Sequence, residues 1–178
     1  PNTGNPNPFA KLHKAIGEDK SDNAASVSSL LSFGDFRFLC CGDLTWNIEA
    51  KLVIPNNPIG QVDVFMVTHH GLPSSNNPAF VLAIDPVVAV MCNGPTKGGA
   101  EQTQTTLRKV KSLKDLYQLH ASINLPLEQQ APKKNIANYG KLGECEGVYV
   151  KLSVAADGEN YTVQIGSDGK KRSYATRR

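Results

Sequence analysis

Residues 62–71 read Val-Asp-Val-Phe-Met-Val-Thr-His-His-Gly, and this stretch decides how the fold is interpreted. Its first seven residues form a nearly continuous apolar run, which is typical of a strand that is buried on both faces. Residues 87–92, Val-Val-Ala-Val-Met-Cys, form a second run of the same kind. Strands of this kind belong to a sheet that is covered on both faces, so the two runs predict a layered domain.

Strand and helix patterns alternate along the chain on both sides of these runs. A Gly34-Asp35 turn between two apolar segments is typical of a hairpin. Thr45 and Asn77 are suited to cap helices. Strands are expected at 26–33, 36–41, 62–68, 87–92 and 116–120, and helices at 45–53, 78–84 and 102–111. This alternation favours an α/β domain over a sandwich of strands alone.

The ends of the chain differ from this central pattern. Residues 1–22 are polar and rich in Pro, Gly and Asn, which predicts a lead-in loop with one helical turn. Residues 124–141 are expected to be an irregular insertion. Residues 147–176 alternate with period two and predict terminal strands that form a hairpin.

Composition limits the classes of protein to which the chain can belong. The 178 residues are 40% hydrophobic and 20% charged, which fits one soluble globular domain. No apolar run approaches the ~20 residues that a membrane-spanning helix needs. The net charge of +3 and the 7% aromatic content give little support to a nucleic-acid-binding protein.

Basic residues gather near the C-terminus. A solvated tail and a phosphate-contacting tail are both consistent with such a cluster. Its members are Lys170, Lys171, Arg172, Arg177 and Arg178.

The four cysteines have no C-x-x-C spacing, which excludes a zinc ribbon and a thioredoxin-type motif. Cys40 and Cys41 are adjacent within an apolar run, where thiols behave as small buried hydrophobic groups. This usage favours a reducing compartment such as the cytoplasm.

Two polar segments directly follow predicted strands, Gly42-Asp43-Leu44-Thr45 and His69-His70-Gly71. Ligands of open α/β sheets bind at the carboxyl ends of the strands, so Asp43, His69 and His70 are expected on one edge of a sheet. Carboxylate oxygens and imidazole nitrogens suit zinc or a similar divalent ion. Two other interpretations remain open: Asp43 as a helix N-cap, and the histidines as a solvated loop pair.

The order of these motifs resembles the second half of metallo-β-lactamase-fold hydrolases of the competence-protein (ComEC-like) type. The resemblance covers most of residues 22–176. It is carried by Asn23-x-x-Ser26, Gly42-Asp43-Leu44, Glu49, Asp63-Val64, His69-His70-Gly71, Pro86, Asn93-Gly94-Pro95, Tyr117-Gln118-Leu119-His120 and Ile136-Ala137-Asn138.

The resemblance implies a metal-dependent hydrolase that uses two divalent ions, normally zinc, to activate a water for attack on an ester or phosphodiester. Asp43 would bridge the two metals, and His70 would be a ligand of the second metal. His70 is preferred over His69 because a small residue, Gly71, follows it. His69 would contact a substrate phosphate or support the ligands.

The main metal motif of that family, His-x-His-x-Asp-His, has no counterpart among the four histidines. A zinc site needs at least three protein ligands, and Asp43 and His70 are only two. Residues 23–178 are therefore expected to be the C-terminal half of an αββα sandwich, inactive without its N-terminal half.

Such a half would have a mixed sheet with helices on one face and a terminal hairpin, and would leave an apolar sheet face uncovered. The missing half, a second copy or another protein could cover that face. The alternative is a non-catalytic interaction module that docks through this face.

Overall fold

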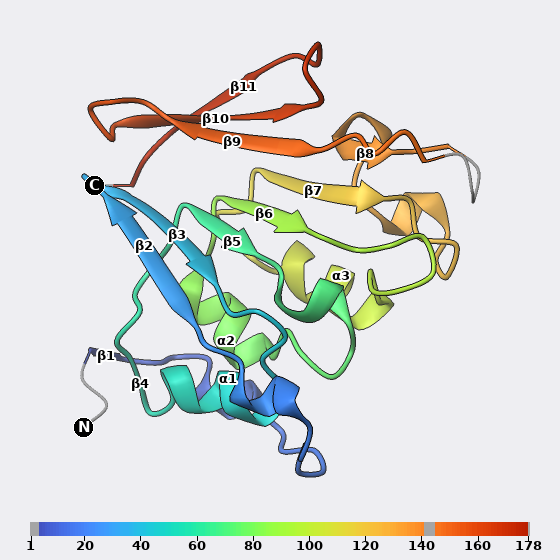
Figure 1. Cartoon of the computed structure of the whole chain (residues 1–178). Coiled ribbons are helices and arrows are strands. Elements are labelled where there is room, and N and C mark those ends of the chain that lie inside the picture. The colour runs from blue at the N-terminus through green and yellow to red at the C-terminus, as the bar shows by residue number, and fades with distance from the viewer. Residues whose placement is uncertain (1–3, 141–144, 178) are drawn as a thin grey trace.

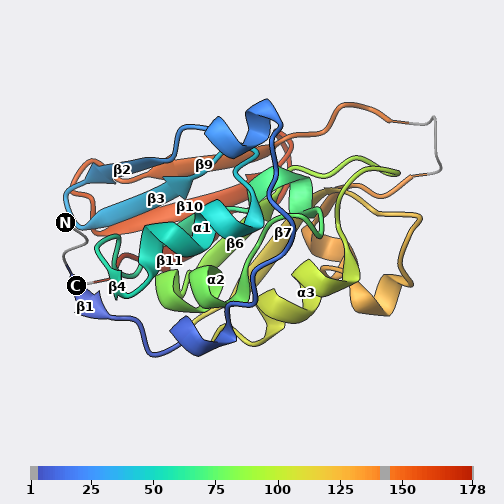
Figure 2. The same ribbon diagram turned by 90° about the horizontal axis from the view of Figure 1, so that it is seen from below.

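The computed structural model describes residues 4–140 and 145–177. These residues form three layers: helices, a six-stranded mixed sheet and a three-stranded antiparallel sheet (Figure 1). The helices α1 (Trp46–Val53), α2 (Pro78–Ile84) and α3 (Glu101–Arg108) cover one face of the large sheet (Figure 2). The expected α/β class, with a mixed sheet and helices on one face, is confirmed.

The large sheet has the strand order β2-β3-β5-β6-β7-β8. β2 is antiparallel to β3, and every other neighbouring pair is parallel. The carboxyl ends of β3 and β5 therefore meet at one edge, as the two polar segments require. The strands are β2 (Ser29–Phe33), β3 (Phe36–Cys40), β5 (Val64–Met66), β6 (Val88–Met91), β7 (Asp115–His120) and β8 (Ile136–Asn138).

Local signals placed α2 more accurately than α1. The Asn77 side chain accepts a hydrogen bond from the Ala79 N–H at 3.0 Å, so its predicted capping role is confirmed. Thr45 occupies the N-cap position of α1, as the sequence predicts, but its side chain makes no capping hydrogen bond with a described residue. The backbone carbonyl of Thr45 nevertheless accepts from the Glu49 N–H at 2.9 Å.

The segment 124–141 is more ordered than the sequence indicates. It contains the short 3-10 helices Leu127–Gln129 and Lys133–Asn135, and then β8, which pairs with β7. A three-residue strand is too short to show a period, so its sequence reads as irregular. Residue 141 lies outside the described residues.

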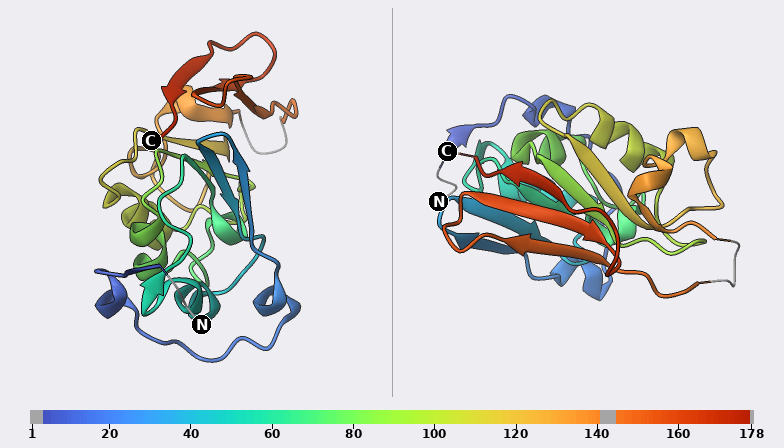
Figure 3. Two further views of the ribbon diagram at one scale, coloured as in Figure 1. Left: turned by 90° about the vertical axis from the view of Figure 1, so that its left-hand side faces the viewer. Right: turned by 90° about the horizontal axis from the view of Figure 1, so that it is seen from above.

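The terminal strands β9 (Val150–Val154), β10 (Asn160–Ile165) and β11 (Arg172–Ala175) form the small sheet, with β10 in the centre. This sheet lies over the large one (Figure 3). A core between the sheets is built from Phe36, Val64, Val87, Val88, Tyr117, Tyr161, Val163 and Tyr174. The expectation of an entirely uncovered apolar face is therefore wrong, because the chain's own last three strands cover the middle of it.

The edge strand β2 remains uncovered. All five of its residues are exposed, and Leu31 and Phe33 retain 56% and 53% of their accessible surface. Leu31 pairs with Phe38 across the β2–β3 ladder. Together with the preceding Val27, Leu30, Leu31 and Phe33 place exposed apolar side chains along this edge.

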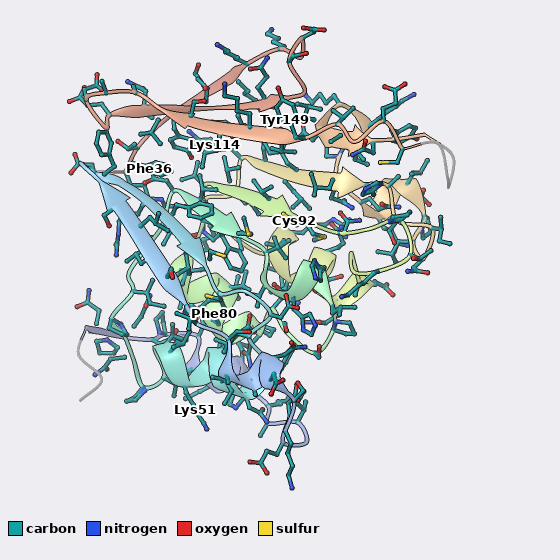
Figure 4. The ribbon with its side chains drawn as sticks, viewed as in Figure 1. Phe36, Lys51, Phe80, Cys92, Lys114 and Tyr149 are labelled. Carbon is teal, nitrogen blue, oxygen red and sulfur yellow. The ribbon has the colours of Figure 1, made fainter. Side chains whose placement is uncertain are left out.

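A second core lies between the large sheet and the helices. In it, the rings of Phe65 and Phe80 meet edge to face with centroids 5.8 Å apart. Figure 4 shows Phe80 on the helix side and Phe36 on the small-sheet side of the large sheet. The large sheet therefore has buried apolar side chains on both faces, as its continuous apolar runs predict.

The N-terminal residues pack along the helix layer. β1 (Asn5–Pro6) pairs with β4 (Asn56–Asn57), and the buried Asn7 donates a hydrogen bond to the Ala79 carbonyl at 3.1 Å. The indole N–H of Trp46 donates to the Lys14 carbonyl at 2.8 Å. Within the described ranges, no helix combines the length and the apolar character that crossing a bilayer demands.

Candidate metal centre

Asp43, His69 and His70 come together at the carboxyl edge of the large sheet, as the sequence predicts. Asp43 follows β3, and the two histidines follow β5. The His70 Nε2 lies 3.7 Å from Asp43 Oδ1, and the His69 Nε2 lies 3.8 Å from Asp43 Oδ2. Each carboxylate oxygen therefore faces one ring nitrogen, at a distance too long for a hydrogen bond.

The backbone that presents the histidines has an uncommon conformation. His69, His70 and Gly71 have φ values of 52°, 56° and 78°, so three successive residues are left-handed. For a non-glycine residue this conformation costs about 1–3 kcal/mol and is concentrated at functional sites. The local structure thus accepts strain in order to turn both rings toward Asp43.

Hydrogen bonds from two neighbouring loops hold this strained turn. The His69 N–H donates to the Gly42 carbonyl at 3.0 Å, and the Gly99 N–H donates to the His70 carbonyl at 3.0 Å. A side chain at Gly98 could not be accommodated, because its Cβ would lie 2.0 Å from the His70 carbonyl oxygen. Gly98 and Gly99, which closely follow the motif Asn93-Gly94-Pro95, therefore support His70.

The protonation of the His70 ring follows from its partner. The His70 Nδ1 lies 2.8 Å from the Cys92 carbonyl oxygen, which can only accept a hydrogen bond. Nδ1 therefore carries the proton, and Nε2 presents a lone pair toward Asp43 in the neutral ring. A backbone carbonyl on the other ring nitrogen is the usual arrangement that orients a metal-ligating histidine.

The same reasoning fixes the His69 ring. Ser75 Oγ donates its hydrogen to the Leu44 carbonyl at 2.7 Å, so it accepts from the His69 Nδ1 at 3.2 Å. Nε2 is then unprotonated, and it accepts from the Asn23 side-chain amide at 3.3 Å. His69 is 8% exposed, and burial lowers the pKa of its ring below the usual value, which favours the neutral form near pH 7.

A divalent cation fits this set of donors. Two lone pairs face a carboxylate, so these groups repel one another unless a proton or a cation lies between them. Two ligands about 2.1 Å from a tetrahedral zinc ion lie roughly 3.4 Å apart, close to the observed 3.7 and 3.8 Å. However, no group of three or more His, Cys, Asp or Glu side chains within the described residues has the geometry of a metal site. Among the described residues, Asp43, His69 and His70 therefore do not by themselves complete a metal site.

The two simpler interpretations do not account for these positions. The N-cap residue of α1 is Thr45, and the Asp43 side chain faces the histidines. The pair is not a solvated loop either, because His69 is buried and His70 is partly buried. The capping and the loop interpretations are therefore wrong.

Sequence reasoning missed the groups that set the two ring tautomers. Asn23 was quoted only as part of a motif, and the Cys92 carbonyl gives no signal in a sequence. Ser75 could have been found, because a hydroxyl that closely follows a histidine is a common ring partner. Comparison of the chain with protein-family models, with curated proteins and with solved structures found no match.

Proposed function

We propose that Asp43 and His70 are ligands in the metal centre of a hydrolase of the metallo-β-lactamase superfamily, ComEC-like in type. The centre takes two divalent ions, most suitably zinc, which supply the activation of a water for attack on an ester or phosphodiester. The chain contributes the C-terminal half of the αββα sandwich. It is inactive until the remaining ligands are supplied.

One observation carries this proposal. The Nε2 atoms of two imidazole rings, each ring fixed by a hydrogen bond at its Nδ1, face the two oxygens of one carboxylate. Asp43 retains 35% of its side-chain surface and His70 retains 33%, so the donors open toward solvent. An open side of this kind is where further ligands and a substrate would bind.

The two histidines have different roles in this proposal. The Nε2 of His70 makes no hydrogen bond to a described residue, and it is therefore free to ligate. The Nε2 of His69 already accepts from Asn23. His69 therefore suits a position beside the metals, where its ring holds or releases a proton near a substrate phosphate.

The partner in this proposal is the segment that carries the other ligands. The uncovered apolar edge at β2, with Leu31 and Phe33, gives such a segment a surface on which to pack. A second copy of the chain would compete for the same surface. A larger exposed apolar patch marks a contact site in most soluble proteins.

Zinc titration by calorimetry on the purified 178-residue chain tests the proposal. Because the chain holds only part of the centre, we expect it to bind Zn²⁺ weakly, and we expect Asp43→Asn and His70→Asn to weaken that binding further, at least about tenfold. Asparagine tolerates the left-handed backbone at position 70, so the second variant should fold. The matched control is His120→Gln, which should leave zinc affinity unchanged.

Zinc affinity that is the same in the wild type and both variants would overturn the assignment. The interaction-module alternative makes the opposite prediction. A module that only docks through β2 has no use for the strained histidines, so its binding would not depend on Asp43 or His70.

A further inference from the structure

A hollow of about 630 Å³ lies on the side of the large sheet away from the helices. One wall is the short helix Lys133–Asn135, which precedes β8, and the other is the turn between β10 and β11. Tyr117 of β7 lies between them. The two walls are far apart in the sequence, so only the tertiary fold brings their side chains together.

The charged residues that line this hollow have one sign. Of the residues that the structure describes, Lys134, Lys170, Lys171 and Arg172 line it, and no aspartate or glutamate does. The Arg172 guanidinium is paired with Asp115 at 2.7 Å. Among the described residues, the three lysines take part in no ion pair. Unpaired charges of the same sign raise the local potential and attract an anion.

A buried polar network lies under the hollow and fixes Arg172. Asp115 is 7% exposed, and it also accepts hydrogen bonds from Tyr174 at 2.7 Å and Asn135 at 3.0 Å. The Tyr174 hydroxyl in turn lies 2.8 Å from that of Tyr117. Asp115, the carboxylate that pairs with Arg172, is therefore fully engaged below the hollow and does not neutralise the lysines.

The backbone holds two of the lysines at the rim. The turn that carries Lys170 and Lys171 is so tight that a Cβ at Gly169 would lie 2.0 Å from the Ile165 carbonyl oxygen. By contrast, the neighbouring Lys133 is engaged over the ring of Tyr139, with its Nζ 4.6 Å from the centroid. The fold thus directs Lys134, Lys170 and Lys171 to one place.

We propose that this hollow binds the phosphate group of a small phosphorylated ligand. Lysine ammonium groups bind phosphate as point charges, and a fixed arginine adds directed N–H donors. The volume lies within the range of about 300–1,000 Å³ that is usual for small-molecule sites. A single-stranded nucleic acid is less suited, because it needs exposed aromatic platforms and Tyr117 is only 3% exposed.

Calorimetric titration with inorganic pyrophosphate tests this site. We expect saturable binding that weakens as the sodium chloride concentration rises from about 50 to about 200 mM. Lys134→Gln and Lys171→Gln should each weaken binding about fivefold, and the double variant about twentyfold. The matched control is Lys151→Gln on β9, an exposed lysine outside the hollow, which should change affinity less than about twofold. Thermal unfolding should be the same for all four variants.

A second titration uses a fluorescein-labelled twelve-nucleotide single-stranded DNA, followed by anisotropy. DNA binding that is tighter than pyrophosphate binding, and that is lost in the same variants, would overturn the small ligand in favour of a nucleic-acid backbone. Pyrophosphate affinity that Lys151→Gln reduces as much as Lys134→Gln would overturn the site itself, because only general surface charge would then be at work.

Discussion

The two ends of the large sheet hold acidic residues in opposite circumstances. At the amino end, Asp63 is completely buried, and its two oxygens accept from the backbone N–H groups of Arg37 at 2.8 Å and Arg177 at 2.9 Å. At the carboxyl end, the half-exposed Asp43 accepts no hydrogen bond from a described residue and faces two ring lone pairs. The carboxylate of Asp63 is thus fully hydrogen-bonded within the fold, whereas that of Asp43 has no hydrogen-bond donor among the described residues.

The amino end is closed further by Asp85. This residue accepts from Ser112 at 2.7 Å, Gln61 at 2.9 Å and the Arg177 guanidinium. Burial raises the pKa of Asp63, and the hydrogen bonds from Arg177 and Arg37 oppose that shift. Buried carboxylates whose oxygens all accept hydrogen bonds hold secondary-structure elements together. A carboxylate without such donors, beside a strained turn, is typical of a functional site.

The largest expected effect on stability comes from removing the Asp63 carboxylate at the amino end of the large sheet. Asp63→Ala removes the acceptor of two partly buried backbone N–H groups, and it should lower the free energy of unfolding by about 3 kcal/mol. Urea denaturation monitored by circular dichroism measures this loss. The control is Asp35→Ala in the exposed hairpin turn, which should stay within about 0.5 kcal/mol of the wild type. Equal losses in both variants would remove the distinction between a satisfied and an exposed carboxylate.

A smaller effect is expected at Glu49, which is fully buried in helix α1. Its Oε2 accepts from the Asn77 N–H at 2.8 Å, whereas Oε1 has no partner among the described residues. Burial raises the pKa of Glu49 to about 7. In the unfolded chain the group ionises near its ordinary pKa, so its contribution to stability is complete below about pH 4.5 and is lost as pH rises through 7.

Glu49→Gln should therefore be close to the wild type in stability near pH 5. At pH 8 it should be more stable by on the order of 2 kcal/mol, because the neutral amide avoids burying a charge. Urea denaturation at the two pH values measures the difference. A stability difference that does not change with pH would show that Glu49 does not titrate in this window.

The smallest expected effect on stability comes from changing Asp43 at the carboxyl end of the large sheet. Asp43→Asn should change the free energy of unfolding by no more than about 0.5 kcal/mol, because the carboxylate is half exposed and makes no hydrogen bond within the described residues. Thermal denaturation in metal-free buffer measures this. A loss similar to that of Asp63→Ala would mean that Asp43 is structural, and the comparison between the two ends would fail.

Local signals in the sequence were sufficient for much of the fold. Asn77 and the following proline predict α2, and Gly34-Asp35 predicts the β2–β3 hairpin, because in both cases the deciding contacts lie within a few residues. β1, β4 and β8 were missed because two or three residues carry no period. The small sheet's position over the large one was missed as well, since packing between distant segments leaves no local signal.

The sequence predicted which acidic and basic side chains form the candidate centre, but not which ring nitrogen of each histidine carries the proton. Asp43, His69 and His70 were expected together because parallel strands bring their carboxyl ends to one edge. The ring tautomers depend on Ser75 and the Cys92 carbonyl, which tertiary structure places there. The left-handed backbone at both histidines was not predicted either, because histidine, although enriched among non-glycine residues at positive φ, adopts this conformation in only a small fraction of cases.

The hydrogen bond from Trp46 to the Lys14 carbonyl has a practical consequence. Trp46 is the only tryptophan in the chain, and it begins α1 three residues after Asp43. Its emission spectrum is thus an intrinsic optical reporter for the N-terminal segment. A red shift that precedes the loss of far-ultraviolet ellipticity during denaturation would show this segment detaching while the sheets remain folded.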